Sequence, residues 1–134
     1  MLVYRFVSER ELVNILSGNN HLLGAEYNGQ YKLSNNHKYE KGVKYLHFFK
    51  HKSAISFIRL YHTKDNCKHF VCTFDIPYSV LFKGKGKGRY ETGGMEYLTT
   101  TEREYIIPTN EFDCSWLKSY QTEQSYLDEQ QAQR

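Results

Sequence analysis

Two glutamates, Glu102 and Glu104, stand two residues apart in a segment that predicts a strand over residues 102–107, ended by Pro108. Because side chains alternate along a strand, both carboxylates are expected on one face. If that face lines a cleft, one carboxylate can hydrogen-bond a sugar hydroxyl and stabilise positive charge developing at an anomeric carbon, while the other orients the attacking group. The alternative is a solvated strand face with no chemical role.

Arg5 lies in the middle of the apolar segment 2–7, which predicts a strand. A charged side chain is rarely buried in such a strand without a partner, so we expect an anion beside it. Two anions fit the planar guanidinium: a carboxylate of the protein, or a phosphate of a ligand.

His47 lies in a second predicted strand, residues 43–49, with the aromatic residues Tyr45 and Phe49 on its own face. Aromatic rings beside a histidine can hold a planar base such as adenine or nicotinamide. The alternative is a histidine that packs in the core.

Two other patterns give weaker signals. Soft and imidazole ligands gather at His62, Cys67, His69 and Cys72, but their spacing lacks the paired knuckles of a structural zinc site, so we expect no metal. Residues 83–89, Lys-Gly-Lys-Gly-Lys-Gly-Arg, lack the ending of a phosphate-binding P-loop. They predict a flexible basic loop that either attracts phosphates or solubilises a turn.

The first helix should follow the first strand directly. Ser8 and Glu11 have the spacing of a capping box, and Gly18 stands where the helix would end. The spacing of the apolar residues predicts one buried stripe, formed by Leu12, Ile15 and Leu16.

The rest of the chain predicts further short elements. A second helix is expected over residues 53–61, and its buried face would carry Ala54, Phe57, Ile58 and Tyr61. Residues 68–76 give the clearest strand, and residues 19–42 predict a long loop or short strands. The predicted fold is one α+β domain over residues 1–118, followed by a Gln-rich tail or terminal helix over residues 119–134.

Composition limits the class of protein. The chain has 134 residues, 40% hydrophobic and 16% aromatic, and a net charge of +3, which excludes intrinsic disorder and disfavours a two-domain enzyme or a dedicated duplex-DNA binder. We expect no membrane span, because no apolar run approaches about 18 residues. The three cysteines, an odd number without export features, predict reduced thiols and a cytoplasmic protein.

Three motifs in chain order resemble the small ADP-ribosyltransferase family, in particular its bacterial and phage members. They are Tyr4-Arg5, the strand Tyr45-Leu-His-Phe-Phe49, and Glu102-Arg-Glu-Tyr-Ile-Ile-Pro108. The resemblance implies a split antiparallel sheet with short flanking helices, NAD as the substrate, and a macromolecular acceptor that is a protein, RNA or DNA. It also implies a glycosyl-transfer reaction in a toxin or anti-defence setting.

The resemblance also implies roles for individual residues. Arg5 would contact the NAD phosphate or ribose, Glu104 would be the catalytic glutamate, and Glu102 would position the acceptor. Members of this type usually carry Ser-Thr-Ser in the middle strand, where this chain has Leu46-His-Phe48 and its nearest serine at Ser53. Taken together, the residues that the resemblance implies as NAD contacts are Arg5, Tyr4, His47, Phe49 and Ser53.

Two alternatives stay open. A histidine in the middle strand is also similar to that of RNA 2′-phosphotransferases, which use NAD with RNA. The other alternative is a non-catalytic binding module, such as a phage or mobile-element inhibitor of a host protein or nucleic-acid complex. That module would act through the tyrosine-containing residues 19–42 and the basic residues 83–89.

Overall fold

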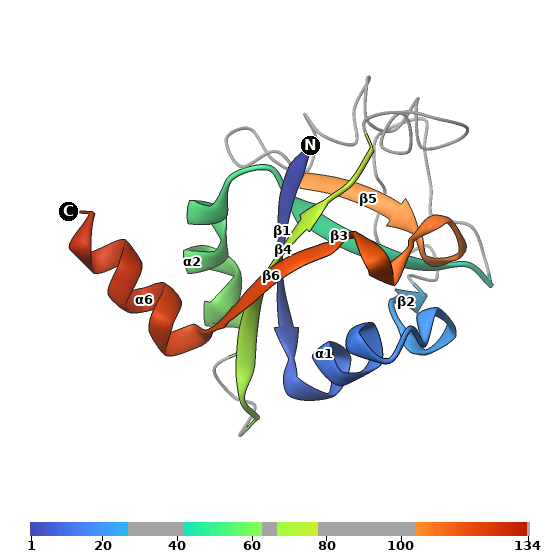
Figure 1. Ribbon diagram of the computed structural model, residues 1–134, viewed down its shortest axis with the longest axis horizontal. Coiled ribbons are helices and arrows are strands. Elements are labelled where there is room, and N and C mark those ends of the chain that lie inside the picture. The colour runs from blue at the N-terminus through green and yellow to red at the C-terminus, as the bar shows by residue number, and fades with distance from the viewer. Residues whose placement is uncertain (27–41, 63–66, 78–103, 134) are drawn as a thin grey trace.

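The computed structural model describes residues 1–26, 42–62, 67–77 and 104–133. Within these residues the chain forms one antiparallel sheet of six strands with three α-helices, which confirms the α+β class (Figure 1). Several predicted features lie outside the described residues: the basic loop 83–89, Glu102, and most of the segment 19–42.

The sheet has the strand order β2-β3-β1-β4-β6, and β5 pairs with β3 off this path. Its strands are β1 (Leu2–Ser8), β2 (Ala25–Glu26), β3 (Lys44–Phe49), β4 (His69–Asp75), β5 (Glu104–Pro108) and β6 (Leu117–Thr122). β1, β3, β4 and β5 are strands that periodicity and composition predicted, with bounds that differ by no more than two residues. β6 was not predicted as a strand.

The two neighbours of β1 pair with it very differently. β4 is in register with β1 from Leu2↔Asp75 to Ser8↔His69, whereas β3 joins β1 through Tyr4↔Phe49 alone. β3 is held instead by β5, which pairs with it from Tyr45 to Phe49, and by the short strand β2. The ladder between β1 and β3 therefore stops after one residue pair.

Helix α1 (Glu9–Leu16) begins where the capping box predicted it. Ser8 is the N-cap, and its hydroxyl accepts a hydrogen bond of 3.2 Å from the backbone N–H of Glu11. Gly18 follows the helix with φ of +74°. Leu12 and Ile15 are buried as predicted, but the prediction was wrong for Leu16, the last residue of the helix, which is 55% exposed.

The helices cover opposite faces of the sheet (Figure 1). α1 packs on one face, over the larger core, to which β1, β3 and β4 contribute Val3, Val7, Leu46, Phe48, Cys72 and Phe74. α2 (Ile55–Ile58) and α6 (Glu123–Ala132) lie on the other face. The second core there consists of Phe6, Phe49, Ala54, Ile55, Val71 and Tyr126.

The predicted helix over residues 53–61 is a composite. Short 3-10 helices, Lys52–Ala54 and Arg59–His62, flank the single turn of α2. Ala54 is buried as predicted, but Phe57 is 62% exposed and Ile55 is buried in its place. The prediction was wrong for Phe57. A 3-10 helix has about three residues per turn, whereas an α-helix has about 3.6, so the flanking 3-10 turns shift the buried face along the sequence.

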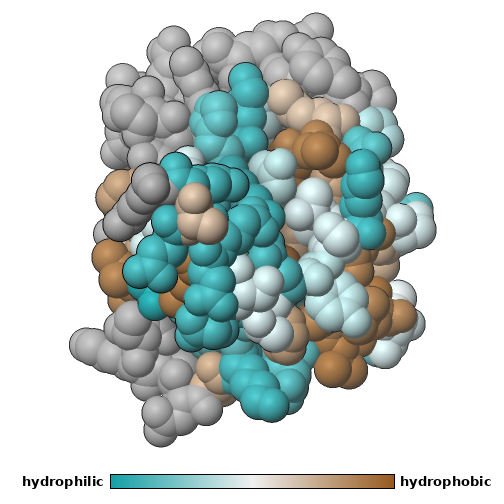
Figure 2. Space-filling model, turned by 60° about the vertical axis from the view of Figure 1, so that its left-hand side comes forward, coloured by the Kyte–Doolittle hydropathy of each residue, from teal (hydrophilic) through white to brown (hydrophobic). Residues whose placement is uncertain are grey.

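The C-terminal segment completes the sheet. β6 pairs with β4 and spans the boundary predicted at residue 118. α6 follows directly, and its N-cap Thr122 accepts a hydrogen bond of 3.1 Å from the N–H of Ser125. The surface of this helix is mainly hydrophilic (Figure 2), while its Tyr126 is fully buried against the sheet.

Candidate functional site

The three motifs of the sequence lie on three adjacent strands. Tyr4 of β1 is the register partner of Phe49 of β3, and Phe49 is in turn the partner of Glu104 of β5. Residues far apart in the sequence thus form one row across the sheet. Glu102, two residues before Glu104, lies outside the described residues.

Tyr4 and Phe49 share a face of the sheet, because register partners in an antiparallel pair point the same way. Tyr4 is half-buried and packs against the second core, to which Phe49, at 7% exposed, belongs. His47 lies two residues from Phe49 on β3 and is half-buried, while Ser53 is exposed before α2. The stacking surface predicted from Tyr45, His47 and Phe49 is therefore wrong for its two aromatic residues, because Tyr45 is 1% exposed in the larger core and Phe49 is buried in the second. His47 remains half-buried, as does Tyr4 on the neighbouring strand.

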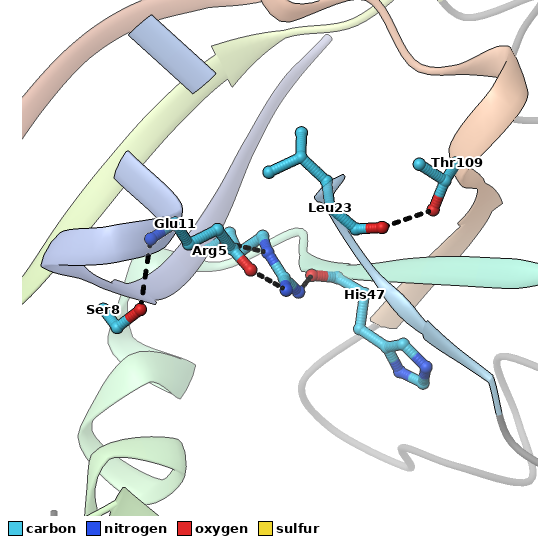
Figure 3. A network of polar contacts seen from close by, with 6 residues as sticks. All are labelled: Arg5, Ser8, Glu11, Leu23, His47 and Thr109. Atoms are coloured by element: carbon cyan, nitrogen blue, oxygen red, sulfur yellow. Dashed lines mark hydrogen bonds and ion pairs between the residues drawn. The ribbon is translucent and has the colours of Figure 1, made fainter. Parts of the chain in front are cut away.

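Arg5 has the anion that the sequence predicted, and the anion is a carboxylate of the protein. Its Nε and Nη2 donate to the two carboxylate oxygens of Glu11, each at 2.7 Å (Figure 3). Its Nη1 donates to the backbone carbonyl of His47 at 2.9 Å. This is the bidentate geometry in which a guanidinium binds a carboxylate most tightly.

The ion pair lies largely inside the protein. The side chains of Arg5 and Glu11 are 18% and 19% exposed, and Arg5 Cζ lies 6.0 Å from the centroid of the Phe48 ring. Burial raises the pKa of the neighbouring Cys72 thiol to about 12; Glu11 adds to the rise and Arg5 opposes it. Cys72 is therefore neutral at physiological pH and is no nucleophile.

Arg5 and Tyr4 are consecutive residues, so their side chains lie on opposite faces of the sheet. Tyr4 packs beside Phe49, whereas Arg5 faces α1 and is bound by Glu11. A phosphate that used the same guanidinium fork would have to displace Glu11. The fork is therefore not available to NAD in the arrangement described.

Glu11 is the partner of Arg5 that sequence reasoning missed. Its spacing from Ser8 was explained by the capping box, and this explanation concealed a second partner. The pair could have been predicted from one signal: an arginine inside an apolar strand is followed, six residues later, by a glutamate in the first turn of the next helix.

A pocket of about 430 Å³ lies at the other end of β3, and it is lined in the described part of the chain by Asn20, His21, Gly42, Val43, Lys44, Thr109 and Asn110. Its wall is tied together by two contacts to backbone carbonyls. Lys44 Nζ donates to His21 O at 3.1 Å. Thr109 Oγ1 donates to Leu23 O at 3.5 Å, as Figure 3 shows. Lys44 and Phe49 stand at opposite ends of β3, so the pocket is separate from the row of Tyr4, Phe49 and Glu104.

The histidine and cysteine residues considered for zinc are dispersed. Cys67 is exposed and Cys72 is buried, while His69 stacks on Phe6 with ring centroids 4.8 Å apart. Among the described residues no three His, Cys, Asp or Glu side chains are grouped as metal ligands. Across the same residues, no helix has the length and apolar character needed to cross a membrane.

Comparison with known proteins gives no relative: no family model, no curated protein and no solved structure matches this chain.

Proposed function

We propose that this protein is an NAD-dependent mono-ADP-ribosyltransferase that modifies a protein or nucleic-acid acceptor. The observation that supports the proposal is the row formed by Tyr4, Phe49 and Glu104 across β1, β3 and β5. Parts of three short motifs, far apart in the chain, lie on adjacent strands, and this supports the proposal.

The chemistry assigned to Glu104 follows from the charge that develops during transfer. The bond between the nicotinamide nitrogen and C1′ of the ribose breaks, and its electron pair leaves with nicotinamide, which becomes neutral. Positive charge then spreads over C1′ and the ring oxygen, and a carboxylate beside the ribose stabilises it. The acceptor atom bonds to C1′ and gives up its proton, so that one proton and one nicotinamide are released for each transfer.

The remaining residues bind and orient. Tyr4 and His47 provide half-buried aromatic surface for the base, and the exposed Ser53 provides a hydroxyl at the start of the following helical segment. Glu102 is assigned to the acceptor. Phe49, buried in the second core, supports this surface from below.

The binding step is tested by thermal unfolding in the presence of NAD. Millimolar NAD at a site of micromolar affinity should stabilise the protein by about 4 kcal/mol, through RT ln(1 + [L]/Kd) at a thousandfold excess. Free nicotinamide at the same concentration serves as the ligand control. An unchanged melting temperature with NAD would contradict the proposal.

A non-catalytic binding module is the second candidate, and a different observation favours it. Phe57 and Leu60, three residues apart at the surface, are 62% and 58% exposed. Exposed aromatic and aliphatic side chains close together are typical of protein interfaces. Such a module would show no response to NAD, so the same titration separates the two candidates.

A further inference from the structure

Arg5 bridges β1 and β3 at the point where their backbone pairing stops. Beyond the pair Tyr4↔Phe49, a continued antiparallel ladder would bring Arg5 opposite Phe48 and Phe6 opposite His47. These pairs are absent from the described strands. Instead the Arg5 side chain donates to the carbonyl oxygen of His47 at 2.9 Å.

Glu11 fixes the direction of that side chain. Its two oxygens hold Nε and Nη2 of Arg5, so the planar guanidinium is oriented with Nη1 toward β3 (Figure 3). Glu11 is itself fixed by the first turn of α1, where its N–H binds the N-cap Ser8. The contacts therefore tie α1, β1 and β3 together through one guanidinium.

We infer that Arg5 is a positioning residue: held by Glu11, it clamps β3 to β1 and so sets the place of His47 and Phe49. This replaces direct contact with the NAD phosphate, the role that the family resemblance implied for Arg5. The consequence for NAD rests on the proposed function, whereas the clamp itself does not.

The clamp is tested by amide hydrogen exchange in the full chain. Arg5→Lys keeps the positive charge but loses the fork, because an ammonium cannot reproduce three contacts in one plane. Loss of a hydrogen bond from a charged donor should speed exchange in β3 roughly ten- to a hundredfold, while β4 changes little. Glu11→Gln, which leaves the N-cap contact of its backbone in place, should act in the same direction more weakly.

Arg59→Lys is the matched control for this experiment. Arg59 Nε binds Glu123 Oε2 at 2.9 Å in an ion pair of comparable exposure, which joins the 3-10 helix Arg59–His62 to α6 and includes no residue of the sheet. The control should leave β3 exchange unchanged. An Arg5→Lys variant with unchanged β3 exchange, or with equal acceleration in β3 and β4, would overturn the clamp.

The change in NAD affinity caused by Glu11→Gln shows whether Arg5 positions β3 or binds the NAD phosphate itself, because the two roles predict changes of opposite sign. If Arg5 positions β3, Glu11→Gln and Arg5→Lys both weaken NAD binding several-fold. If Arg5 binds the phosphate directly, Glu11→Gln frees the fork and strengthens binding, which would overturn the inference. Should the unmodified protein bind no NAD, the proposed function fails, and the exchange experiment still decides whether the clamp exists.

Discussion

Tyr4 and Arg5 are neighbours on β1 whose side chains serve opposite faces of the sheet. Tyr4 packs with Phe49 in the second core, whereas Arg5 binds Glu11 of α1 and lies over Phe48. Two consecutive residues expected to contact one NAD molecule therefore have separate tasks. In the function that we propose, Tyr4 contacts NAD, whereas Arg5 holds the strands that carry the site.

Tyr126 anchors α6 to the body of the protein by its ring and by its hydroxyl. The hydroxyl donates to the backbone carbonyl of Lys52 at 3.0 Å and lies 2.8 Å from Ser56 Oγ. Tyr126→Phe should lower the free energy of unfolding by about 1 kcal/mol, and Tyr126→Ala by about 3–5 kcal/mol. Urea unfolding measures both. The control is Tyr120→Phe, at a half-exposed position, and an equal effect of the two Tyr→Phe changes would refute the anchoring role.

Gly24 and Gly18 form a matched pair for testing the packing beside β3. Both have positive φ, +76° and +74°, so alanine at either position costs about 1–2 kcal/mol in backbone strain. A Cβ at Gly24 would also lie 2.8 Å from the Tyr45 carbonyl oxygen and would overlap Thr109 Oγ1, whereas Gly18 has open space. Gly24→Ala should therefore be the more destabilising change by at least about 1 kcal/mol in urea unfolding. Equal losses would show that the contact with Thr109 relaxes freely.

Cys72 should make the free energy of unfolding fall as the pH becomes alkaline. Burial raises the pKa of its thiol from 9.0 to about 12 in the folded state. Because the pKa of the thiol is higher in the folded than in the unfolded state, its contribution to the free energy of unfolding is fully present below pH 9. This contribution is lost as the pH rises toward 12, by at most about 1.4 kcal/mol per pH unit. Cys72→Ala should flatten this part of the stability curve, while Cys67→Ala, at an exposed site, should not. If the free energy of unfolding fell with pH in the same way for Cys72→Ala and the unmodified protein, Cys72 would not be the cause of the alkaline loss of stability.

The three thiols should differ in reactivity. Cys67 is exposed, Cys114 is half-buried with a pKa raised by burial and by Asp113, and Cys72 is buried. Iodoacetamide at pH 8 should therefore modify Cys67 first, Cys114 more slowly and Cys72 last, as peptide mass spectrometry would record. Modification of Cys72 as fast as Cys67 would mean that β4 opens readily.

Local signals in the sequence were sufficient for much of the fold. Ser8 and Glu11 placed the start of α1, and dense β-branched and aromatic residues placed β1, β3 and β4. β6 was missed because Leu117–Thr122 lies at the edge of the sheet and is mostly exposed, so its residues carry no hydrophobic alternation. A terminal helix was one of the two alternatives for the Gln-rich end, and α6 is that helix. The burial of Tyr126 was not predicted, because it is a single buried ring in a helix of polar residues.

The candidate site was predictable only as a set of motifs. Arg5, His47 and Glu104 were identified from residue type and strand position, but strand pairing depends on contacts between distant segments. The row through Tyr4, Phe49 and Glu104 therefore required the structure. The role of Arg5 required it too, because one residue of strand register decides which face the guanidinium occupies.

The most direct measurement of the central claim is the release of nicotinamide from NAD by the purified protein and by Glu104→Gln. Because the change removes the charge of the carboxylate and keeps its size, we expect release by the unmodified protein and a loss of roughly a hundredfold in the variant, with the melting temperature unchanged. Glu26→Gln, at an exposed glutamate of β2, is the matched control and should release nicotinamide at the full rate. Equal rates for Glu104→Gln and the unmodified protein, or no release by either, would contradict the assignment of ADP-ribosyl transfer.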